Sequence, residues 1–244
     1  MARAAATQAS LAVRVAVFAF DPEPGLAPAR GLHVLTVNRS LPGAAVERSE
    51  SLAAAAVRAV VEAGMEGNAR RGRGGRVVSL RLVGIGEESG RGRTVTPWYL
   101  ATAPYEPPGG AGQWTPAGRA PRLDAQDTAA LKAAHAQLKL DTRYVAGTAA
   151  LLGEVFTGDD LLRVHVALHG GPQGSERTFR RRVQELRDAG VLKPVRESEV
   201  MMLRQRYPRF RSPSGTGGRP PELLRYGGGG EREQLAGLRA RRSA

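Results

Sequence analysis

Arginine side chains cluster on one face of a predicted helix in the C-terminal half of the chain. Within residues 175–190, Phe179, Val183 and Leu186 recur at i, i+4 and i+7, so they face a core. We predict that the other surface contacts DNA through Arg177, Arg181 and Gln184 opposite the core and through Thr178, Arg180 and Arg182 beside them. The planar fork of an arginine suits guanine edges and phosphate oxygens, so these residue types point to nucleic-acid recognition.

The sequence before this helix predicts a first helix and a tight turn. Thr157 is a suitable N-cap, and Asp159 and Asp160 place negative charge in the first helical turn. The glycine-rich residues 170–174 then end the helix, and Ser175 caps the next one. Two short helices joined by a glycine turn, with arginines on the second, are typical of a helix-turn-helix.

A wing is expected after the second helix. Residues 191–195 read as a strand, and residues 219–226 are expected to pair with it, with Arg219 holding a phosphate and a long arginine-rich loop between the two strands. Residues 177–211 contain eleven basic and four acidic residues, the same excess as the whole of residues 141–244, which contain nineteen and twelve. The net charge of the C-terminal half therefore lies on the predicted reading helix and wing, although the solvated face of an ordinary helical subdomain is the alternative.

Composition limits the chemistry further. The 244 residues carry a formal net charge of +13, which favours a polyanionic partner, unless the charge merely solvates the surface. The chain has no cysteine, and its four histidines do not form a zinc-binding spacing, so we expect no metal and no cofactor. No apolar run is long enough to cross a membrane. Residues 1–10 carry one arginine and a few alanines, which is too little for a secretory signal. We expect a cytoplasmic protein.

The N-terminal half predicts a mixture of strands and helices. Apolar runs and turn residues indicate strands at 11–20, 32–39, 77–85 and 94–101, and helices at 50–63 and 124–138. Between them we expect a basic loop at 69–76 and a Pro/Gly-rich loop at 104–121. This order predicts a first domain over residues 11–140, a second over 141–226 and a disordered tail over 227–244.

Residues 41–65 (LPGAAVERSESLAAAAVRAVVEAGM) resemble a degenerate Nudix box, the motif Gly-x5-Glu-x7-Arg-Glu-U-x-Glu-Glu-x-Gly-U with U aliphatic. Glu50, Arg58 and Glu62 match the motif. Gly64-Met65 match its final Gly-U after a one-residue deletion. The motif's first glycine and its two other glutamates are replaced by Ala44, Ala59 and Ala63. An alanine-rich helix that happens to follow Leu-Pro-Gly is the alternative interpretation.

The missing glutamates bear on catalysis, because Mg²⁺ needs several hard oxygen ligands to clamp a pyrophosphate. A single Glu62 cannot replace that cluster, so we predict no catalytic residues and no hydrolase activity. The candidate ligand-binding residues are instead Arg39, Glu50, Arg58 and Glu62.

Both halves together resemble the Nudix-related transcriptional regulators (NrtR-like). The resemblance spans about residues 11–226 and is carried by the degenerate box, Trp114-Thr-Pro, residues 144–156, Arg177-Thr-Phe-Arg-Arg-Arg, and residues 218–220 with 224–226. It implies an α+β chain: an N-terminal Nudix-like α/β/α sandwich and a C-terminal winged helix-turn-helix. It also implies a homodimeric repressor of NAD-metabolism or sugar-utilisation genes whose effector is ADP-ribose or a related nucleotide sugar. Compared with the family, the chain has a deletion beside Gly64 and a shortened segment before Leu41. Both changes border the expected effector pocket.

The sequence therefore favours a regulator that binds double-stranded DNA and has a non-hydrolytic Nudix-like domain. The segment 141–155 has helical spacing and is expected to transmit effector binding between the domains. A divergent Nudix hydrolase acting on a nucleoside diphosphate substrate is the alternative. A third reading is a non-specific nucleic-acid-binding or partner-binding adaptor.

Overall fold

The chain forms two compact units. The computed structural model describes residues 10–23, 27–65, 79–89, 93–119, 122–143, 145–171, 175–211 and 220–227. The first unit comprises Met1–Ala19 with His33–Leu140, and the second comprises Phe20–Leu32 with Asp141–Ala244. The second unit therefore combines a segment from the N-terminal part of the sequence with the C-terminal part.

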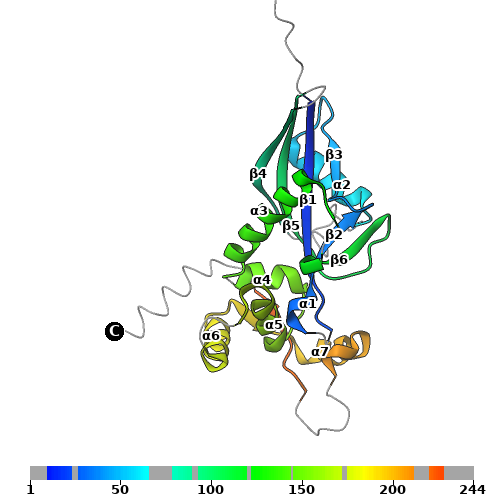
Figure 1. Ribbon diagram of the computed structural model, residues 1–244. Helices are drawn as coiled ribbons and strands as arrows, with labels where there is room; N and C mark the ends of the chain where they lie inside the picture. The colour runs from blue at the N-terminus through cyan, green and yellow to red at the C-terminus, as the bar shows by residue number, and fades with distance from the viewer. Residues whose placement is uncertain are drawn as a thin grey trace, which may run out of the picture. The chain divides into compact units, whose positions relative to one another are not determined.

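A mixed β-sheet is the centre of the first unit (Figure 1). Its strands are β1 (Ser10–Phe20), β2 (Leu32–Val37), β3 (Gly43–Ala45), β4 (Ser79–Ser89), β5 (Arg93–Thr102) and β6 (Gly112–Pro116). They lie in the order β4-β5-β1-β2-β6, and β3 pairs with β1. Strands β1 and β5 run parallel, whereas β4–β5, β2–β6 and β1–β3 are antiparallel.

A helix packs on each face of this sheet. Because successive side chains of a strand point to opposite faces, β1 can serve two cores at once. Its Val13 and Val15 pack with Ala55 and Ala59 of α2 (Leu52–Glu62). On the other face, the Phe18 ring lies 6.0 Å from the His135 ring of α3 (Ala125–Asp141). The first unit is therefore an α/β/α sandwich, as predicted.

The predicted strands and helices of the first unit are confirmed with small shifts at their ends, but one loop is wrong. Residues 104–121 contain β6 and the 3-10 helix η1 (Ala117–Arg119). Trp114 lies in β6 opposite Leu35 of β2, and its indole N–H donates to the Glu106 carbonyl (2.6 Å). This long-range pairing offsets the local preference of a Pro/Gly-rich stretch for loop structure. The predicted basic loop 69–76 lies outside the described residues.

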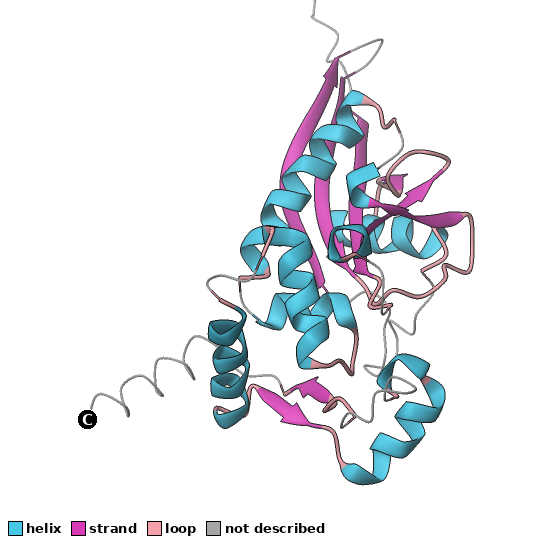
Figure 2. Cartoon of the chain, turned by 60° about the horizontal axis from the view of Figure 1, so that its bottom comes forward, coloured by secondary structure: helices cyan, strands magenta, loops and turns pink. Residues whose placement is uncertain are grey.

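The second unit is mainly helical. Its elements are α1 (Pro28–Gly31), α4 (Val145–Leu152), α5 (Gly158–His169), α6 (Glu176–Asp188), β7 (Leu192–Pro194), α7 (Glu197–Arg206), the 3-10 helix η2 (Pro208–Phe210) and β8 (Leu224–Tyr226). Strands β7 and β8 form an antiparallel pair, as predicted for residues 191–195 and 219–226 (Figure 2). Residues 228–244 of the predicted tail lie outside the described residues. In the described part of the chain no helix is long and apolar enough to cross a bilayer.

Helix α7 corrects the prediction of a long arginine-rich loop between the two wing strands. Val200 and Leu203 pack into a core cluster with Val155, Phe210 and Leu223, and burying them stabilises the helix. Its first turn is acidic and its last turn is basic, which complements the helix dipole. The charge pattern was visible in the sequence, whereas the excess of arginine obscured the two apolar positions.

Candidate functional site

Helix α6 has the two faces that the sequence predicts. The Ser175 hydroxyl accepts a hydrogen bond from the Thr178 N–H (3.2 Å) and caps the helix. Phe179 and Leu186 are buried, and Val183 is half-buried. The helix is thereby held through one face, and the opposite face is left to solvent.

The solvent face carries the predicted reading residues Arg177, Arg181 and Gln184, all exposed. The Arg181 side chain is 73% exposed, and its guanidinium lies 3.9 Å from the Glu185 carboxylate. Gln184 donates to Asp188 (2.8 Å). For Arg177 the described part of the chain provides no hydrogen bond or ion pair. Surface pairs of this kind contribute about 0–1 kcal/mol, so a DNA ligand can displace them at little cost.

The remaining predicted DNA contacts differ in their surroundings. Thr178 and Arg180 are exposed, and Arg180 pairs with Glu176 (2.6 Å). Arg182 is half-buried and donates to the Arg143 carbonyl (3.2 Å), so part of its donor capacity is used within the chain. Arg219 lies outside the described residues.

Helix α5 supports α6. Thr157 and Asp160 form a reciprocal capping box, in which the Thr157 hydroxyl accepts from the Asp160 N–H (3.1 Å) and the Asp160 carboxylate accepts from the Thr157 N–H (2.9 Å). Gly170 ends α5 with φ +76°, a left-handed conformation that glycine adopts without strain. The His165 ring meets the Phe179 ring edge-on at 5.1 Å, which packs α5 on α6. The predicted caps of both helices are confirmed.

An open groove runs beside α6, and sequence reasoning did not identify it. The N-terminal end of α5, one side of α6 and the residues around β8 line it, with Leu162, Phe179 and Leu224 contributing apolar surface. On its edge, Arg187 pairs with Glu222 (2.7 Å). Arg187 follows Gln184 by three residues, so the two side chains lie on the same side of α6. That spacing was the signal in the sequence that could have placed Arg187 beside the groove.

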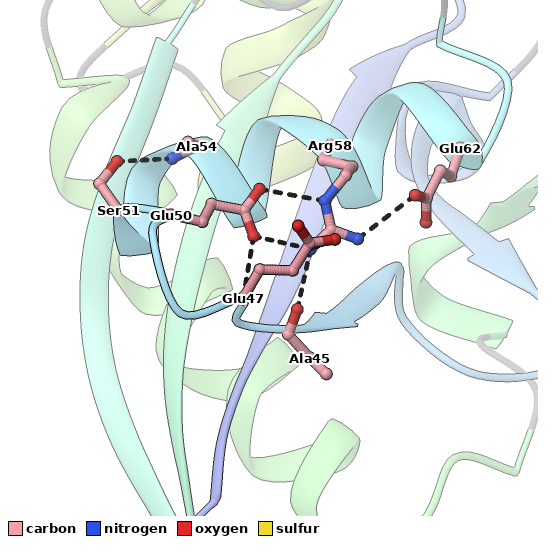
Figure 3. Close-up of polar contacts among 7 residues, drawn as sticks. All are labelled: Ala45, Glu47, Glu50, Ser51, Ala54, Arg58 and Glu62. Atoms are coloured by element: carbon pink, nitrogen blue, oxygen red, sulfur yellow. Dashed lines mark hydrogen bonds and ion pairs between the residues drawn. The ribbon is translucent and has the colours of Figure 1, made fainter.

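In the first unit, the residues that carry the Nudix-like spacing form an ion-pair cluster (Figure 3). Glu50 accepts from Arg58 twice, at Oε1 from Nε (3.0 Å) and at Oε2 from Nη2 (2.7 Å). The same Nη2 donates to the Ala45 carbonyl (2.8 Å), and Arg58 also lies 3.8 Å from Glu47 and 3.4 Å from Glu62. The hydrogen bond from Arg58 lowers the pKa of Glu50, and the same contact raises the pKa of Arg58.

The other positions of the motif are not part of this cluster. Ala59 and Ala63 stand where the motif has glutamates, and both are 2% exposed within the core cluster on α2. Arg39 is exposed in a tight turn at φ +66° and is not among the contacts of Arg58. The structure thus brings together three of the four candidate ligand residues, Glu50, Arg58 and Glu62.

The donor set does not fit the Mg²⁺ that a Nudix box implies. Mg²⁺ binds through carboxylates whose oxygens are available to it. Both Glu50 oxygens accept from Arg58, and a Glu62 oxygen lies against the same guanidinium. Across the described ranges no group of three or more acidic, histidine or cysteine side chains is arranged to hold a metal ion. We therefore derive no metal-dependent step from this site.

Comparisons with known proteins agree with the fold. No family model and no curated protein matches the sequence, but solved structures match most of the chain. The fold is that of a Nudix-related protein: a mixed sheet with helices, extended by a second unit. The chain is thus NrtR-like in fold, which confirms the predicted resemblance at that level.

Three of the matching structures are similar over nearly their whole length. NrtR of Shewanella oneidensis gives a TM-score of 0.63 at 21% identity, covering 89% of this chain and 94% of that chain. The same protein complexed with a 27mer DNA gives 0.61 at 20%, covering 93% and 95%. A MutT/nudix family protein from Enterococcus faecalis gives 0.60 at 16%, covering 90% and 88%.

Proposed function

We propose that the protein is a sequence-specific DNA-binding transcriptional regulator, acting as a repressor, whose second unit is a winged helix-turn-helix. The observation that carries the proposal is the solvent face of α6, where Arg177, Arg181 and Gln184 are exposed on a helix capped at Ser175 and packed on α5. A helix held in this way enters a major groove with its N-terminal residues toward the bases. The fold shared with S. oneidensis NrtR, which has been solved with a 27mer DNA, supports the same reading.

Replacing Arg177 or Arg181 with alanine is expected to weaken operator binding by about 5- to 150-fold, because each bidentate base contact is worth about 1–3 kcal/mol. Discrimination between operator and unrelated DNA is expected to relax as well. Arg219→Ala should instead weaken binding to all DNA sequences alike. It should also reduce the slope of the logarithm of the binding constant against the logarithm of the salt concentration by about one. The measurement is fluorescence anisotropy with labelled DNA from upstream of the protein's own gene, or with sites selected from a random library.

The matched control is Lys132→Ala, which removes one exposed positive charge from α3 in the first unit. It should leave the affinity unchanged. Wild-type affinity in both arginine variants would refute α6 as the reading helix. Equal affinity for every sequence would favour the non-specific adaptor.

We further propose that the first unit is a non-hydrolytic sensor of ADP-ribose or a related nucleotide sugar, and that the regulator is a homodimer. One reading helix contacts few base pairs, so two-fold symmetric half-sites about one helical turn apart are the usual remedy. An effector then acts by binding the DNA-free form more tightly, with a typical coupling of about 1–3 kcal/mol. Operator titrations with and without ADP-ribose, together with a mass measurement on DNA, test both points.

The protein is expected not to hydrolyse ADP-ribose or nucleoside diphosphate sugars with Mg²⁺ or Mn²⁺. The reason is the arrangement on α2, where Ala59 and Ala63 are buried and Arg58 occupies the remaining carboxylates. The assay is release of phosphorylated product from each substrate, with a Nudix hydrolase as positive control. Metal-dependent turnover that disappears in Glu62→Gln would restore the hydrolase alternative.

A further inference from the structure

The connection between β1 and β2 belongs to the second unit, although the bodies of both strands form the sheet of the first. Its two ends are joined, because the Asp21 N–H donates to the Gly31 carbonyl (2.8 Å). Phe20 is fully buried, and a Cβ on Gly31 would lie only 2.7 Å from its ring, so the two residues pack without room for a side chain. The two ends of the connection are therefore joined and packed against each other.

Arg163 of α5 holds this connection. Its Nη1 donates to the Pro22 carbonyl and its Nη2 to the Glu23 carbonyl, both at 2.7 Å. Its guanidinium also lies 5.8 Å from the centre of the Phe20 ring. Two charge-assisted bonds from one planar fork to successive carbonyls fix the direction of the backbone as well as its distance. Helix α1, which is part of the connection, packs on α5 as well.

Electrostatics link the same connection to the start of α5. Burial lowers the pKa of Arg209, while the carboxylates of Asp160 and Asp21 act in the opposite direction. Asp160 is the capping-box residue of α5. The half-buried Arg209 thus lies within electrostatic reach of carboxylates from both the connection and the helix cap.

Helix α5 also contacts the proposed reading helix. Arg163 binds the connection, and two residues further on His165 packs against Phe179 of α6. About 100° of rotation per residue separates these two side chains by roughly 200° around the helix, so they leave α5 on different sides. Within the second unit, α5 therefore has the connection on one side and α6 on another.

We propose that the β1–β2 connection, bound to α5 by Arg163, couples the first unit to the helix-turn-helix, with Arg163 as the positioning residue. Its value as a regulatory route rests on the proposed function. The strands it joins carry core residues of the first unit, such as Val15 and Leu35, so a change in that sheet reaches the connection through continuous backbone. The proposal places the coupling in this connection and not in the predicted route through residues 141–155.

The test uses the full-length chain and needs neither DNA nor effector. Both tryptophans, Trp98 and Trp114, lie in the first unit, so tryptophan fluorescence reports its unfolding alone, whereas far-ultraviolet circular dichroism reports both units. Val195→Ala perturbs only the core of the second unit. In the otherwise native chain it should lower both thermal midpoints by about 3 °C. In an Arg163→Ala background it should lower the dichroism midpoint and leave the fluorescence midpoint unchanged.

Two further variants separate coupling from general destabilisation. Arg163→Lys keeps the charge but loses the two-carbonyl fork, so it should uncouple the units as alanine does. Lys132→Ala removes a charge elsewhere and should leave the coupling intact. A Val195→Ala chain with a native fluorescence midpoint would overturn the proposal, as would coupling that survives Arg163→Ala. Neither result bears on DNA binding, which the α6 variants test separately.

Discussion

Replacing Asp127 with alanine is expected to cost the first unit about 3–5 kcal/mol of unfolding free energy, because it breaks a buried ion pair from one side. The Asp127 carboxylate is fully buried, accepts from Arg14 Nε on β1 (3.0 Å) and accepts from the Leu41 N–H (2.8 Å). One side chain of α3 thus joins the central strand and the segment after β2. Removing it leaves the Leu41 N–H without an acceptor in the interior and the partly exposed Arg14 guanidinium without its carboxylate.

Tryptophan fluorescence during urea unfolding measures this loss. The control is Asp124→Ala, which removes an exposed carboxylate that caps α3 by accepting from the Asp127 N–H (2.7 Å). A lost cap costs about 1 kcal/mol. If Asp127→Ala costs no more than Asp124→Ala, the buried pair does not hold the sandwich together.

Acid is expected to destabilise the second unit through His165. The ring is 6% exposed, and burial lowers its pKa to about 4, assisted by His169 and Arg182 nearby. The unfolded chain binds this proton near pH 6.5, whereas the folded chain resists it until about pH 4. The stability is therefore complete above pH 6.5 and falls as the pH drops from 6.5 to 4. The full loss is about 3 kcal/mol, since one pKa unit corresponds to about 1.36 kcal/mol.

His165→Leu isolates this contribution, because it keeps an apolar side chain against Phe179 and removes the titrating group. The free energy of unfolding, followed by circular dichroism at several pH values, should fall less steeply in acid for the variant than for the wild type. Parallel pH profiles would show that other groups cause the acid sensitivity.

Local sequence patterns predicted the elements whose signals are local. The caps at Thr157 and Ser175, the apolar stripe of α6 and the alternating strands could all be read from a few neighbouring residues. Helix α7 was missed because its apolar residues form one short run, 200–203, in a segment otherwise rich in arginine. Strand β6 was missed because its pairing partner is β2, far away in sequence.

The candidate sites follow the same rule. The spacing of Glu50 and Arg58 identified two residues that do meet, because Glu50 lies just before the N-cap of α2 and the long Arg58 side chain reaches back toward that end of the helix. The contact of Arg163 with the Pro22 and Glu23 carbonyls joins residues about 140 positions apart, and it uses backbone acceptors that every residue has. No side-chain pattern could have signalled it.

The buried alanines of α2 leave no room for glutamates at two positions of the Nudix-like motif. Ala59 and Ala63 are each 2% exposed and pack against the sheet, so Ala59→Glu or Ala63→Glu would place a carboxylate in a core shaped around methyl groups. An unpaired charge in such a place costs several kcal/mol. Neither glutamate of the motif could therefore be introduced by a single substitution without destabilising the first unit.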